Sequence, residues 1–300
     1  MRDRRIYRFV QWGMVLIVFG IFPACEELSP VPDSELPEFV DQLVLNASFD
    51  NGRPISLETS NTSWAYDSLL PGVIDDAEID LSVDGASVPV NYNPSSRRYE
   101  STRVPKPGEL YSILAFRGSY ARISSTLNIP EDLDNVQSGY VPDGGIDPQG
   151  NPGDLMFIEF DDPGSKDFYE LHFYYFSELA EIFVPFDFEL TDETLLSPNT
   201  LKLNSGGFLF SDELFNGTRK RFTAAITSSL TRGNSDIKYL IELRKVNQDY
   251  WKYWRTLQQY RDQEDQIANG PFGNAVIIHS NVSGGLGIFM GSNLQSDTIR

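Results

Sequence analysis

Side chains suited to catalysis are scarce in this sequence of 300 residues. His172 and His279 are the only histidines, and Cys25 is the only cysteine. A serine hydrolase would need one histidine as a base and a GxSxG turn, and a zinc protease would need HExxH spacing; neither motif is present. Paired carboxylates could hydrolyse a glycosidic bond, but 43 acidic residues make any one pair uninformative. The sequence therefore predicts a protein that is not an enzyme, with no catalytic residue, cofactor or established metal site.

Oxygen-bearing side chains gather in the acidic segment 143–154. They are Asp143, Asp147, Asn151 and Asp154. Calcium takes carboxylate and carbonyl oxygens from loops of this kind. The spacing does not match an EF-hand, and a solvated acidic loop explains the same residues, so calcium binding stays open.

Cys25 follows a segment that is typical of secretion. A basic start is formed by Arg2, Arg4, Arg5 and Arg8. The apolar run at 13–22 is shorter than the roughly 20 residues of a membrane-spanning helix. The following Phe22-Pro23-Ala24-Cys25 resembles the lipobox of bacterial lipoproteins, although Phe22 and Pro23 depart from the usual pattern. We predict a signal peptide at 1–24 and lipidation of Cys25 with acyl chains such as palmitate.

Residues 25–38 are rich in proline, serine and acids, which predicts a flexible tether. Glu26 and Glu27 resemble the surface-export signal of Bacteroidetes lipoproteins. Cleavage would remove four of 24 basic and one of 43 acidic residues, leaving 20 against 42 and a net charge of −22. That charge repels phosphates, so nucleic acid is not an expected partner.

The remaining chain predicts a mainly β fold, because short alternating segments are separated by Gly, Pro, Asn and Asp. In Ala77–Val83 the apolar residues share one face, and Asp84-Gly85 predicts a hairpin after it. Strands of this size predict an N-terminal Ig-like β-sandwich at 39–130. We expect a linker or long loop at 131–153 and a second β-rich domain at 154–300.

One amphipathic helix is predicted at 247–267, with Asn247 as its N-cap. Apolar and aromatic side chains recur along it at intervals of three and four residues. Packing on the second domain explains most of them. Trp251 falls outside this stripe, so Trp251 and Trp254 are candidate contacts to a partner or ligand.

Glycines crowd the end of the chain at Gly284, Gly285 and Gly287. They lack the GxGxxG spacing and the following helix of a dinucleotide site. We interpret them as structural, because glycine lets another backbone approach closely.

This ending also carries a family resemblance. The helix that starts Asp249-Tyr250-Trp251 and the later run from Ile278 to Phe289 (IHSNVSGGLGIF) resemble lipoproteins of domain of unknown function family 4249. Members typically end in YSN-x-x-GGLGIF, and His279 replaces the more usual Tyr. Further similarities are SDELFNG at 211–217 and PGELY at 107–111. The resemblance implies a Bacteroidetes source, an Ig-like first domain and often a neighbouring gene for a TonB-dependent receptor; it implies no catalytic residues.

We therefore expect an outer-membrane lipoprotein, facing the cell exterior, that serves as a binding or accessory subunit of a TonB-dependent transport system. Its expected partners are the membrane, through Cys25, a TonB-dependent receptor, and a glycan or peptide ligand. Two alternatives stay open. One is a stand-alone glycan-binding surface lipoprotein, and the other is a carboxylate-dependent hydrolase.

Overall fold

The computed structural model describes residues 39–63, 71–146, 150–177, 180–185, 192–226, 238–267 and 276–299. The described chain is mainly β, with one long helix near its C-terminus, as the sequence predicts. Residues 41–300 form one compact unit. The predicted signal peptide and nearly all of the predicted tether lie outside the described residues.

The first eight strands belong to two sheets. They are β1 (Leu43–Asp50), β2 (Ser56–Asn61), β3 (Glu78–Val83), β4 (Ala86–Val88), β5 (Asn91–Asn93), β6 (Arg98–Glu100), β7 (Leu110–Phe116) and β8 (Ile123–Asn128). One sheet contains the order β1-β2-β6-β5, and the other has the order β4-β3-β7-β8. Side chains of both sheets meet in a shared core. This arrangement is consistent with the predicted Ig-like sandwich.

Alternating burial in β1 shows why these strands form. Every second side chain from Leu43 to Phe49 is buried, and the residues between them are partly exposed. Phe49 makes edge-to-face contacts with Tyr111 at 5.3 Å and with Phe289 at 5.1 Å between ring centroids. Phe289 lies near the end of the chain, so the N-terminal core is completed by C-terminal residues.

The second half of the chain adds nine strands. They are β9 (Asp134–Ile146), β10 (Pro152–Asp161), β11 (Phe168–Ser177), β12 (Ile182–Pro185), β13 (Leu201–Lys202), β14 (Phe208–Ser211), β15 (Arg219–Ile226), β16 (Tyr239–Val246) and β17 (Leu286–Ile299). Strands β15-β10-β9 form a three-stranded sheet. The others extend the sheet that contains β1, in the order β13-β14-β11-β16-β17-β1.

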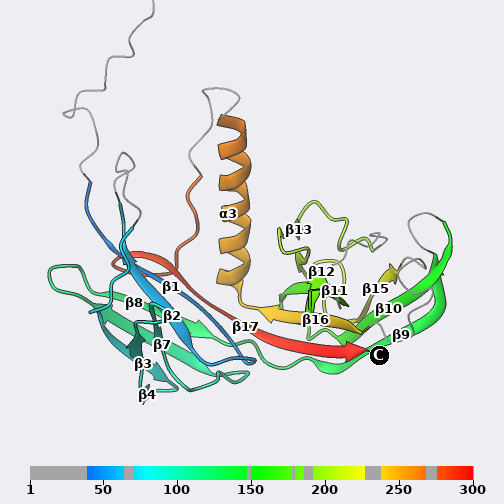
Figure 1. Cartoon of the computed structure of the whole chain (residues 1–300), viewed down its shortest axis with the longest axis horizontal. Helices are drawn as coiled ribbons and strands as arrows, with labels where there is room; N and C mark the ends of the chain where they lie inside the picture. Colours follow the sequence, from blue (N-terminus) through cyan, green and yellow to red (C-terminus); the bar gives the residue numbers. More distant parts are fainter. Residues whose placement is uncertain are drawn as a thin grey trace, which may run out of the picture. The chain divides into compact units, whose positions relative to one another are not determined.

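Strand β17 joins the two halves (Figure 1). Its first part pairs in parallel with β1, from Val44↔Leu286 to Asp50↔Ser292. Its later part pairs antiparallel with β16. One ten-stranded sheet therefore runs through both predicted domains. The sequence did not predict this shared sheet, because pairing between the two ends of the chain leaves no local signal in the sequence.

The predicted linker at 131–153 is also largely wrong. Residues Asp134–Ile146 form the 13-residue strand β9, which pairs antiparallel with β10. Its Gly, Asp and Pro residues hide the alternating pattern. Edge strands tolerate such residues because only one side of the strand is paired.

Helix α3 (Gln248–Ile267) confirms the predicted helix. The Asn247 side chain caps it by accepting a hydrogen bond from the Tyr250 backbone N–H at 3.0 Å. The aromatic side chains of its first turns pack on a cluster that includes Phe168 and Met290. Among the described helices, none has the length and apolarity that crossing a membrane would require.

Candidate functional site

A groove of about 940 Å³ opens in the N-terminal half of the protein. It is lined by residues 54–56 at the start of β2, 87–89 at the end of β4, 91–93 in β5 and 100–103 at and after the end of β6. Between β4 and β5 the chain passes from one sheet to the other, so strands of both sheets line the groove. Its volume is at the upper end of the range for small-molecule sites.

Hydroxyl and amide side chains alternate with apolar ones in the groove, and both of its charged side chains already have partners. Arg103 forms an ion pair with Glu109 at 2.5 Å and also donates to the Tyr111 hydroxyl at 3.2 Å. Glu100 accepts hydrogen bonds from the Ser96 hydroxyl at 2.6 Å and from Asn93 at 2.8 Å. The lining therefore offers neutral hydrogen-bonding groups beside the apolar surface of residues such as Pro54 and Tyr92.

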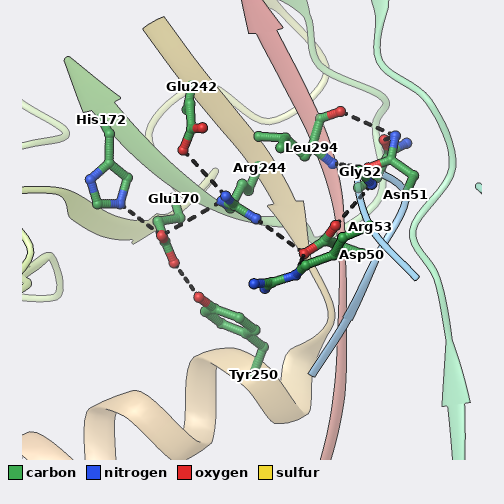
Figure 2. A network of polar contacts seen from close by, with 11 residues as sticks. Asp50, Asn51, Gly52, Arg53, Glu170, His172, Glu242, Arg244, Tyr250 and Leu294 are labelled. Atoms are coloured by element: carbon green, nitrogen blue, oxygen red, sulfur yellow. Dashed lines mark hydrogen bonds and ion pairs between the residues drawn. The ribbon is translucent and has the colours of Figure 1, made fainter. Parts of the chain in front are cut away.

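A second polar cluster is buried where β1, β11, β16, β17 and α3 meet (Figure 2). Glu170 and His172 lie two residues apart on β11, so they share a face of the strand. The Glu170 carboxylate lies 2.7 Å from His172 Nε2 and accepts a hydrogen bond from the Tyr250 hydroxyl of α3. Burial acts to raise the pKa of Glu170, but the hydrogen bonds from His172 and Tyr250 and the charge of Arg244 hold this pKa below its usual value.

Arg244 on β16 is surrounded by three carboxylates. It lies 3.2 Å from Glu242, 3.7 Å from Asp50 and 3.9 Å from Glu170. Asp50 comes from β1 and also pairs with Arg53 at 2.5 Å. This cluster therefore links strands of the N-terminal and C-terminal halves through charge.

The chemistry of this cluster resembles an acid–base site, but its burial indicates a structural role. Glu170 is 6% exposed, His172 3% and Tyr250 8%. The His172 ring stacks on Tyr174 and contacts Gly207 so closely that any Cβ there would overlap it. A general acid or base must lie within hydrogen-bond reach of the reacting atom. These side chains are buried too deeply for a substrate to come that close.

Three carboxylates could hold a metal ion. Asp162, Asp167 and Asp212 each offer a ligand oxygen, and these oxygens lie within 4.8 Å of one another. Tyr169 and the Gly217 N–H donate to Asp162 at 2.5 and 2.8 Å. Burial raises the pKa of both Asp162 and Asp212.

Asp167 and Asp212 each have a hydrogen-bonding or ionic partner as well. Lys245 pairs with Asp167 at 2.9 Å, and the Asp167 N–H donates to Asp212 at 2.7 Å. Through these contacts the three carboxylates connect the ends of β10 and β14 to the start of β11. A hydrolase would need a pair of carboxylates in an open cleft. This group does not provide one, since Asp162 is 6% exposed and Asp212 is 1% exposed.

In the acidic segment 143–154, Asp154 already has hydrogen-bond partners. Asp154 accepts hydrogen bonds from the Tyr140 hydroxyl and from the Asp143 N–H, the latter at 2.9 Å. Asp147 lies outside the described residues. Asp154 therefore fixes the turn between β9 and β10.

The two tryptophans singled out by the sequence do not form an exposed platform. Trp251 packs on Phe168 with 4.9 Å between ring centroids, and the Arg255 guanidinium lies 4.8 Å from the Trp251 ring centroid. Trp254 contacts Tyr250 and Tyr253. Both rings are partly buried in the cluster beneath α3. Their role as partner contacts stays a prediction, and Cys25, the predicted lipidation site, lies outside the described residues.

The C-terminal motif has a clear structural role. Gly287 has φ +119°, and a Cβ on it would overlap the Leu45 carbonyl oxygen of the neighbouring strand. The Asn281 side chain donates to the Phe289 carbonyl at 2.7 Å and accepts from the Phe289 N–H at 2.8 Å. Asp249 of α3 binds Asn281 at 3.1 Å and His279 at 2.8 Å. The interpretation of these glycines as structural is confirmed for the close approach of β17 to β1.

Sequence reasoning missed the groove and the Glu170 cluster for different reasons. The spacing Glu170-x-His172 within a β-strand signals a shared face and could have indicated the pair. The groove combines residues of four separate strands, none of which forms a motif.

Comparison with known proteins agrees with the resemblance carried by the C-terminal motif. A family model described as Domain of unknown function (DUF4249) matches residues 26–298. No curated protein matches the chain. Because the match spans nearly the whole sequence, the chain belongs to the DUF4249 family.

Proposed function

We propose that this protein is a lipid-anchored subunit of the outer membrane, facing the cell exterior, that binds a ligand for a TonB-dependent transport system. The groove of about 940 Å³ is the observation that carries the binding role. It is the size of sites that enclose a small ligand, and its side chains offer hydrogen bonds rather than a reactive group.

The anchoring part of the proposal rests on the sequence. Cys25 follows a basic and then apolar segment, and acids follow it directly. Acylation of Cys25 would hold the protein at a membrane, and the acidic tether would keep its body away from anionic headgroups. The transporter partner is supported by the association that the family resemblance implies.

Binding is favoured over catalysis because both histidines are already paired with carboxylates. His172 is buried against Glu170, and His279 is paired with Asp249 on α3. A carboxylate-dependent hydrolase would need two acids in one open cleft, and the buried pair Asp162 and Asp212 does not provide one.

Affinity purification of the tagged full-length protein from detergent-solubilised outer membranes tests the transporter role. Recovery of a TonB-dependent receptor is expected, and its loss in the Cys25→Ser variant would show that anchoring is needed. Radiolabelled palmitate should be incorporated by the parent and not by Cys25→Ser. Recovery of no receptor would contradict the transporter role, and digestion by protease added to intact cells reports surface exposure.

A stand-alone glycan-binding lipoprotein is the second candidate. The same groove favours it, because hydrogen-bonding side chains and an aromatic ring are suited to sugars. The purification separates the two candidates, since only the first requires a receptor.

A further inference from the structure

We propose that the groove in the N-terminal half binds a neutral oligosaccharide, with Tyr92 packed against a sugar ring. This inference rests on the proposed binding function and names the ligand class. Four features of the groove support it: its charge balance, its polar side chains, its aromatic wall and its short strand edges.

Charge excludes strongly ionic ligands from this groove. The lining contains one cation, Arg103, and one anion, Glu100. Arg103 is held by Glu109 at 2.5 Å. Burial acts to raise the pKa of Glu109, but hydrogen bonds from the Tyr111 hydroxyl and the Lys106 N–H, together with the charge of Arg103, hold this pKa below its usual value. A phosphate or carboxylate ligand would have to compete with Glu109 for Arg103, which costs the existing ion pair.

Neutral donors and acceptors remain around the rest of the groove. Asn91 is exposed on β5, Ser87 is exposed on β4, and Thr102 is exposed beyond β6. Amide and hydroxyl side chains can donate and accept at once, which matches the hydroxyl groups of a sugar. The three residues come from different strands, so they can contact different parts of one extended ligand.

The apolar part of the groove suits the carbon–hydrogen face of a sugar ring. Tyr92 is partly buried, and its ring is fixed edge-to-face against the buried Tyr99 at 5.1 Å between centroids. Pro54 and Pro89 are exposed on the lining. Rigid apolar surfaces lose little entropy on binding, so they favour a ligand with flat apolar patches between its hydroxyl groups.

Strand addition by a peptide is the competing explanation. It would use the outer edges of β4 and β5, which have no strand partner among the described residues. Each of these strands has only three residues, and Pro89 and Pro94 flank β5. Short edges and prolines limit backbone pairing, so recognition by side chains is the better fit.

An array of immobilised neutral oligosaccharides, acidic oligosaccharides and extended peptides, probed with the full-length protein in detergent, tests the proposal. Binding to neutral oligosaccharides is expected. Isothermal titration with the strongest neutral binder then compares variants. Tyr92→Ala should weaken binding about tenfold or more, and Tyr92→Phe, which keeps the ring, should stay within about threefold.

Two further variants guard against misfolding. Asn91→Ala changes an exposed side chain and should weaken binding about threefold or more without changing the thermal transition. Tyr260→Ala removes a tyrosine from α3 and should leave binding unchanged. Preference for peptides or acidic sugars, binding to no neutral oligosaccharide, or equal binding by parent, Tyr92→Ala and Asn91→Ala would each overturn the proposal.

Failure of the proposed ligand class and failure of the proposed transporter role would give different results. Recovery of a TonB-dependent receptor with no binding to neutral sugars would overturn the ligand class and leave the proposed function standing. Groove-dependent sugar binding without a receptor would support the ligand class and contradict the transporter role.

Discussion

Replacing Tyr250 by phenylalanine removes a single hydroxyl from the buried cluster of Glu170, His172 and Arg244. The Tyr250 hydroxyl donates to the Glu170 carboxylate, and both side chains are less than one tenth exposed. The ring itself packs with Val246 and Met290, so the substitution keeps that packing. The main energetic consequence is therefore the loss of one hydrogen bond to a buried charge.

We expect Tyr250→Phe to lower the free energy of unfolding by about 2 kcal/mol, because hydrogen bonds to charged groups contribute about 1.5–3 kcal/mol. Glu170 keeps His172 at 2.7 Å and Arg244 at 3.9 Å, which limits the loss. For a protein of this size the thermal midpoint should fall by about 3–4 °C.

Urea unfolding followed by tryptophan fluorescence measures this change, with the slope m expected to stay constant. Tyr253→Phe is the matched control on the same helix. The Tyr253 hydroxyl makes no hydrogen bond with another described residue, so its loss should change stability by less than about 0.5 kcal/mol. A Tyr250→Phe effect as small as that of the control would refute the reasoning.

Acidification provides an independent check. Because the folded-state pKa of Glu170 is lowered, its contribution to stability is present above its unfolded pKa of about 4.3 and is lost as pH falls through the folded value. The difference between the parent and Tyr250→Phe should therefore shrink below about pH 4.3. A difference that grows on acidification would show that the hydrogen bond does not act through the charged carboxylate.

Three further changes have definite expected outcomes. Gly287→Ala should destabilise by more than about 4 kcal/mol or prevent folding, because its Cβ would overlap the Leu45 carbonyl; near-parental circular dichroism and thermal midpoint would contradict this. Burial raises the pKa of Asp212, so its contribution to stability is present below about pH 3.9 and lost as pH rises; Asp212→Asn should unfold at higher urea than the parent at pH 7 and lose that advantage in acid. Trp251→Ala should cost about 2 kcal/mol in urea unfolding through lost packing on Phe168, and a neutral result would instead favour an exposed binding role.

Local patterns in the sequence were sufficient for much of the fold. Alternation predicted a strand at Ala77–Val83, and the strand observed there is Glu78–Val83. The periodic aromatic segment after Asn247 predicted α3 within one residue at its start. The interpretation of the terminal glycines as points of close backbone approach was also correct. These features depend on contacts within a few residues, or on the missing side chain of glycine, so a single segment carries the signal.

Tertiary structure alone decided how the segments combine. The pairing of β1 with β17 joins residues more than 240 positions apart, as in the hydrogen bond between Asn51 and Asn293. The segment predicted as a linker forms the edge strand β9, because it pairs with β10. The groove and the Glu170 cluster each collect side chains from several strands. Sequence periodicity reports which face of one strand is buried, but the partner of that strand depends on the free energy of the whole fold.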